Sequence, residues 1–129
     1  MYNSVDFYLF MFAVTLVLLQ IKHWYVDFVD QTHEEVVSKG IYGDRAGIYH
    51  SLKQGIGTSI VVIIVAGWYW IFWALLLGVI DFVLHYHIDW AKININKRWN
   101  YTVENPKFWM WLGLDQLACL LYTSDAADE

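Results

Sequence analysis

A long stretch without charge constrains this chain more than any other feature. Between Lys53 and Asp81, residues 54–80 contain no Asp, Glu, Lys or Arg and consist largely of aliphatic and aromatic residues. A second uncharged run covers residues 7–21. Long apolar runs without charge are typical of helices that span a lipid bilayer. The sequence therefore predicts an all-α, polytopic membrane protein.

The composition supports a membrane setting over a soluble one. Hydrophobic residues make up 58% of the 129-residue chain and charged residues only 16%, against about a quarter in soluble domains. No basic stretch suits nucleic acid, and a single Cys excludes a disulfide framework and a Cys-rich zinc site. The expected partner is the lipid bilayer, with another protein or a second copy of the chain as further candidates.

Two arrangements of the central apolar region compete. In the first, one long helix covers about residues 56–80 and an interfacial helix follows it. In the second, helices at about residues 46–66 and 69–96 form a hairpin that turns at Gly67. We favour the hairpin because the region is long enough for two spans of about 20 residues each.

Aromatic residues at the expected turn support the same choice. Trp68, Tyr69 and Trp70 are residue types that concentrate where a membrane meets water. A further helix is expected at about residues 5–30, and another begins at Pro106, since proline suits the first turn of a helix. The prediction is a bundle of about four transmembrane helices.

The basic residues predict the orientation of this bundle. In the hairpin arrangement all eight fall at one face, and the opposite face, with the N-terminus and the Gly67 turn, has none. Because basic loops stay in the cytoplasm, we expect a bacterial inner-membrane protein with its N-terminus outside. The basic residues are Lys22, Lys39, Arg45, Lys53, Lys92, Lys97, Arg98 and Lys107.

The last segment of the chain has an unusual sequence. Residues 119–129 read as the translation of a transposase sequencing adapter, since every residue of the run fits that DNA. We therefore expect that the source gene does not encode them and that the natural protein continues past Ala118. The functional part of the chain is then a single helical membrane domain, residues 1–118.

Ionisable residues recur at helical spacing inside the apolar segments. His23 and Asp27 are four residues apart, as are Asp81, His85 and Asp89, so each set shares one helix face. An Asp at the centre of a membrane helix costs roughly 2.5–3.5 kcal/mol on insertion scales. Such residues therefore usually pair with one another, line water or bind a ligand.

We expect these side chains and two others to form one cluster that opens to the cytoplasm. His nitrogen and Asp oxygen atoms from several helices suit a divalent metal ion such as zinc, which could activate water in a membrane-embedded hydrolase. The candidate metal ligands are His23, Asp27, His50, Asp81, His85, Asp89 and Asp115.

Two other interpretations fit the same residues. Asp–Lys and Asp–His pairs could form a structural network that fixes helix packing, or the residues could relay protons or ions. The sequence has no nucleophile motif, phosphate loop or cofactor fingerprint that separates an enzyme from a non-enzymatic protein, which could be phage-encoded and act on a host partner.

At these residues the chain resembles a family of small bacterial and phage membrane proteins, catalogued as domain of unknown function 3307. The resemblance covers about residues 15–118. It implies an integral membrane protein without an established activity, and it implies His at position 119, where this chain has Cys. The segments that carry it are His23-Trp-Tyr-Val-Asp27-Phe-Val-Asp-Gln31, His50, Asp81-Phe-Val-Leu-His85 with Asp89, and Asp115-Gln116.

Overall fold

The chain folds into helices throughout the part that the structure describes. The computed structural model describes residues 3–125, with side chains through residue 119, and contains no strand in that part. The elements in order are α1 (Ser4–Trp24), the π-helical turn η1 (Tyr25–Val29), α2 (His33–Ser38), α3 (Arg45–Ala66), the 3₁₀ turn η2 (Trp68–Trp70), α4 (Ile71–Trp99) and α5 (Pro106–Asp125).

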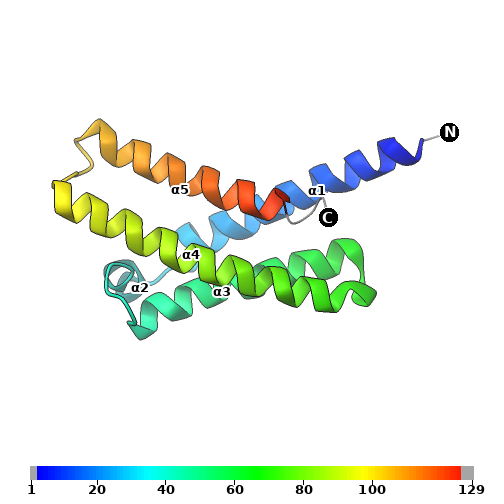
Figure 1. Cartoon of the computed structure of the whole chain (residues 1–129), viewed down its shortest axis with the longest axis horizontal. Helices are drawn as coiled ribbons and strands as arrows, with labels where there is room; N and C mark the ends of the chain where they lie inside the picture. Colours follow the sequence, from blue (N-terminus) through cyan, green and yellow to red (C-terminus); the bar gives the residue numbers. More distant parts are fainter. Residues whose placement is uncertain (1–2, 126–129) are drawn as a thin grey trace.

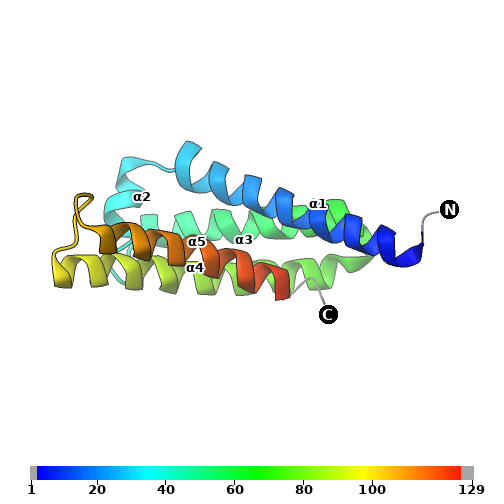
Figure 2. The ribbon, with the colours of Figure 1, turned by 90° about the horizontal axis from the view of Figure 1, so that it is seen from above.

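The central hairpin is confirmed. Helix α3 ends at Ala66, Gly67 reverses the chain with a φ of 88°, and α4 returns antiparallel to α3 (Figure 1). Glycine suits this turn because a positive φ strains other residues. Helices α1 and α5 lie along the hairpin, and α2 lies near the end where α3 begins (Figures 1 and 2).

Within the described residues, three helical segments are long and apolar enough to cross a membrane: Ser4–Val29, Arg45–Ala66 and Trp68–Trp99. Helix α5 is not among them, so the structure supports three candidate spans where the sequence predicted about four. Large apolar side chains such as Phe10 and Ile64 point outward and stay exposed, whereas polar side chains outnumber apolar ones among the buried residues. This distribution suits helices that face lipid and enclose a polar interior.

A short helix lies in the polar segment between α1 and α3. Helix α2 begins after Thr32, whose hydroxyl accepts a hydrogen bond from the Glu35 backbone, while the Glu35 carboxylate accepts one from the Thr32 backbone. This reciprocal capping box stabilises a helix start. The Thr-x-x-Glu pattern was visible in the sequence and could have predicted the helix.

Two glycines let α3 and α4 approach closely. A Cβ atom at Gly55 would lie 2.4 Å from the Gly78 carbonyl oxygen, and one at Gly78 would lie 2.1 Å from the Ser59 hydroxyl oxygen. Small residues commonly allow such close packing between membrane helices. The contact fixes how α3 and α4 are aligned, and therefore which of their polar side chains face each other.

We predict that Gly78→Ala destabilises the protein, because the added methyl group would overlap backbone and hydroxyl atoms of α3. Overpacking of this kind typically costs about 1–3 kcal/mol. Thermal unfolding in detergent, followed by circular dichroism, measures the loss. Gly113→Ala is the matched control, since a Cβ there would meet nothing within 4 Å; equal midpoints for the two variants would contradict the prediction.

Candidate functional site

Three buried side chains from three helical segments point their polar atoms at one place. Asp27 Oδ1 lies 3.0 Å from His50 Nε2 and 3.7 Å from His85 Nε2, and the two imidazole nitrogens lie 3.3 Å apart. Asp27 comes from η1, His50 from α3 and His85 from α4. These three residues, which we call the Asp27–His50–His85 centre, are grouped tightly enough to hold a metal ion.

The π-helical turn sets the direction of Asp27. In η1 the Asp30 backbone nitrogen donates to the Tyr25 carbonyl, five residues earlier, at 2.9 Å. The extra residue per turn rotates the following side chains relative to an α-helix, and such turns often occur at functional sites. His23 lies one turn earlier, with its Nε2 atom 3.1 Å from Asp27 Oδ2. The predicted His23–Asp27 pair is therefore present at the centre.

Asp89 lies beside the centre but is held by lysines. Its Oδ2 atom is 3.3 Å from His85 Nε2 and 3.7 Å from His50 Nε2. The same oxygen lies 2.8 Å from Lys39 Nζ, and Oδ1 lies 2.8 Å from Lys92 Nζ. Asp89 is thus near enough to be a fourth ligand, although its carboxylate is neutralised by two ammonium groups.

Asp81, another of the predicted ligands, pairs with Lys22 and belongs to neither of the two groups of side chains in the described part of the chain that lie closely enough to hold a metal ion. Asp81 accepts hydrogen bonds from Lys22 Nζ, at 2.9 Å, and from the Thr58 hydroxyl. Lys22 reaches it because Gly57 leaves room for the lysine stem, which a Cβ atom would meet at 2.6 Å. Lys22 therefore pairs in the interior and does not join the predicted basic face.

Asp115 is another predicted ligand that contacts a lysine. It pairs with Lys92, which bridges it to Asp89. Helix α5 is thereby tied to α4 by an ion pair that adjoins the centre without contributing a ligand atom to it. The length of the lysine side chain explains both the Lys22–Asp81 and the Lys92–Asp115 pairs. An ammonium group at the end of such a side chain can reach an acid on another helix that does not lie directly opposite the lysine backbone.

The centre also has polar neighbours that the sequence analysis did not single out. His50 Nδ1 lies 3.8 Å from Glu35 Oε2, and Glu35 pairs with Lys53 at 2.9 Å. His85 Nδ1 lies 3.6 Å from the Cys119 sulfur. Position 119, where the resemblance implies His, is therefore at the edge of the centre.

A second group of possible ligands includes this cysteine: His23, His85 and Cys119. We exclude Cys119 from the proposed site because residues 119–129 are predicted to come from adapter DNA. The centre that remains is formed by residues inside the predicted domain.

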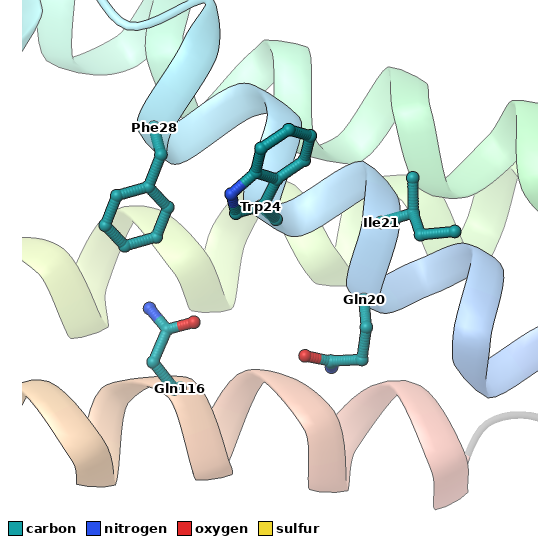
Figure 3. Close-up of a pocket in the computed structure, with 5 residues that line it drawn as sticks. All are labelled: Gln20, Ile21, Trp24, Phe28 and Gln116. Atoms are coloured by element: carbon teal, nitrogen blue, oxygen red, sulfur yellow. The ribbon is translucent and has the colours of Figure 1, made fainter.

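A shallow groove lies between α1 and α5, on a different face of α1 from His23 and Asp27. It has a volume of about 380 Å³, and none of its lining residues belongs to the centre. Two carboxamides and two aromatic rings face it (Figure 3). The lining residues are Gln20, Ile21, Trp24, Phe28 and Gln116.

Comparison with known proteins gives no assignment. No family model matches the chain, and neither the curated proteins nor the solved structures contain a match. The resemblance found in the sequence therefore stays a prediction, and function has to be argued from the site itself.

We predict that the buried Lys22–Asp81 pair is tolerated only when both charges are present or both are absent. Lys22→Met should destabilise the protein by about 3–5 kcal/mol, because it leaves the Asp81 carboxylate buried without its ammonium partner. The double variant Lys22→Met/Asp81→Asn should recover most of this loss. Denaturant titration in detergent compares the three proteins, and a double variant less stable than Lys22→Met would refute the prediction.

Proposed function

We propose that the protein is an integral membrane protein that binds a divalent metal ion at the Asp27–His50–His85 centre. Ligands arranged tetrahedrally at about 2.0–2.2 Å from a metal ion lie roughly 3.3–3.6 Å from one another. The three candidate ligand atoms are separated by 3.0, 3.3 and 3.7 Å, values that bracket this spacing. This convergence carries the proposal.

The charge balance of the interior supports the same position. Among the described residues, the buried carboxylates are Asp27, Glu35, Asp81, Asp89 and Asp115. In the same part of the chain, the lysines that pair with this set are Lys22, Lys39, Lys53 and Lys92.

Asp27 is the buried carboxylate whose charge is least well compensated by a lysine. Among the described residues, the ammonium nitrogen nearest to Asp27 is that of Lys39, 4.0 Å from its Oδ1 atom, whereas the other four carboxylates have one within 3 Å. A buried carboxylate without a compensating charge is unfavourable. Bound metal, or protons on the neighbouring imidazoles, would supply the charge at the place where the nitrogen and oxygen atoms converge.

The surroundings of the ligands suit a metal centre. Metal-binding imidazoles commonly direct their second nitrogen at a carboxylate. Glu35 Oε2 lies 3.8 Å from His50 Nδ1, so this carboxylate is close to the imidazole without a hydrogen bond to it. Three protein ligands leave a further position open, and a metal held in this way supplies a Lewis acid that can activate water. Hydrolysis of a bond within or at the membrane is therefore the activity class that we propose.

A structural ion-pair network is the second candidate function. The observation that favours it is that Lys39 and Lys92 already neutralise Asp89, and Lys92 also holds α5 through Asp115. In this alternative the His residues share protons with Asp27, and the protein is non-enzymatic. Polar pairs of this kind can stabilise helix packing in membranes.

We further propose that α5 completes a four-helix membrane bundle in which the basic loops face the bacterial cytoplasm. Most basic residues lie at the end where α4 leads to α5 and α2 leads to α3, while the N-terminus and the Gly67 turn lie toward the other end (Figure 1). The excess of Lys and Arg on one side supports this orientation.

The metal proposal predicts that His85→Ala abolishes high-affinity zinc binding by the purified protein. Loss of an outer-shell partner typically lowers metal affinity by about 10–100-fold. Loss of one of the three protein ligands should therefore lower zinc affinity by at least this factor. Zinc content by atomic emission and competition titration with a chelating dye measure this change.

His87→Ala is the matched control. His87 is exposed and contacts Tyr42 outside the centre, so this variant should still bind zinc. A wild-type protein that binds no divalent metal would leave the structural network as the better account. Equal zinc binding by wild type and His85→Ala would also reject this centre.

The proposed orientation predicts how engineered cysteines react in intact cells. In a Cys119→Ser background, cysteines at Asn3 and Gly67 should react with a membrane-impermeant maleimide, whereas one at Asn100 should react only after the membrane is permeabilised. The reason is that Asn100 follows the basic end of α4. Labelling of positions 67 and 100 from the same side would contradict the proposed topology.

A further inference from the structure

Gln54 joins two polar groups that otherwise lie apart in the interior. It is fully buried on α3, with 0% of its surface exposed. Its Oε1 atom accepts a hydrogen bond from Lys22 Nζ at 2.8 Å, and its Nε2 atom donates one to Asp27 Oδ1 at 2.8 Å. The side chain therefore links the Lys22–Asp81 pair to the Asp27–His50–His85 centre.

The neighbours of Gln54 leave its amide only one favourable orientation. A lysine ammonium group can only donate hydrogen bonds, and a carboxylate can only accept them. The amide oxygen must therefore face Lys22 and the amide nitrogen must face Asp27. Lys22 is itself held by Asp81 at 2.9 Å, so the pair fixes the direction of the amide.

The hydrogen bond from Gln54 reaches the oxygen of Asp27 that belongs to the centre. Oδ1 is the atom that lies 3.0 Å from His50 Nε2, whereas Oδ2 faces His23. A donor on Oδ1 restrains rotation of the carboxylate and leaves another lone pair of that oxygen for a cation. Buried partners of this kind orient metal ligands and tune their affinity.

From these contacts we infer that Gln54 is a positioning residue of the metal centre, whose amide, oriented by the Lys22–Asp81 pair, directs Asp27 Oδ1 toward the bound ion. The inference rests on the proposed function. It assigns a role to the deep ion pair, which contributes no ligand atom to the centre.

Cobalt(II) is a suitable probe because its visible absorption reports the geometry of its ligands. Gln54→Met keeps a side chain of similar length but removes both hydrogen bonds. We expect it to bind cobalt about 10–100-fold more weakly than the full-length wild-type protein, and to shift the absorption bands of the ion that remains bound. Gln20→Met, which alters a carboxamide in the α1–α5 groove outside the network, should change neither quantity.

A second variant keeps the test valid if Gln54→Met does not fold. Gln54→Glu retains the size of the side chain and can still accept from Lys22, but it cannot donate to Asp27 in its ionised form. We expect the same weakening and band shift. A purely structural role for Gln54 would lower the unfolding midpoint without moving the cobalt spectrum.

The role of the ion pair is tested by a double-mutant cycle. In the Lys22→Met/Asp81→Asn background the Gln54 amide oxygen no longer accepts a hydrogen bond from Lys22. Gln54→Met should therefore weaken cobalt binding by less than it does in the wild-type background. Equal losses in the two backgrounds would show that the pair does not orient the amide.

The outcomes separate the two proposals. If the wild-type protein binds cobalt and the folded Gln54 variants bind it equally well with an unchanged spectrum, the positioning role is wrong and the metal centre stands. If the wild-type protein binds no cobalt, the proposed function fails and the positioning role fails with it.

Discussion

The buried carboxylate of Asp27 is the constraint on which the rest of the site depends. Three imidazoles surround it, and the nearest ammonium nitrogen among the described residues, that of Lys39, is 4.0 Å from its Oδ1 atom. In the interior of a helix bundle, such a charge needs compensation from a cation or from protons. Lysines already neutralise the neighbouring acids. Asp27 is therefore the buried carboxylate that still needs a positive charge, and it faces His50 and His85.

The fold delivers this arrangement through two local features of the backbone. Close packing of Gly55 against Gly78 aligns α3 with α4, which lets His50 and His85 face each other across the hairpin. The π-helical turn at the end of α1 then directs Asp27 at the two imidazoles. Neither feature involves a ligand atom, but a change in either would move the ligands relative to one another.

Much of the fold follows from the sequence, because apolar runs, the Gly67 turn and Pro106 mark helices directly. All three residues of the centre were among the predicted ligands, and helical spacing indicated two of them, since Asp27 follows His23 by four residues and His85 follows Asp81 by four. Spacing along one helix, however, does not determine how far a lysine reaches from another helix. That is why the pairing of Asp81 with Lys22 and of Asp115 with Lys92 could not be predicted. The π-helical turn had no clear sequence signature, whereas the capping box of α2 did.

X-ray absorption at the zinc edge of the zinc-loaded protein tests the central claim most directly, because it reports which atoms contact the metal. The account predicts nitrogen and oxygen neighbours at about 2.0–2.2 Å, with outer-shell scattering from two imidazole rings and no sulfur. A sulfur neighbour at about 2.3 Å would instead place the ion against Cys119. A shell of oxygen atoms without imidazole scattering would contradict the Asp27–His50–His85 centre.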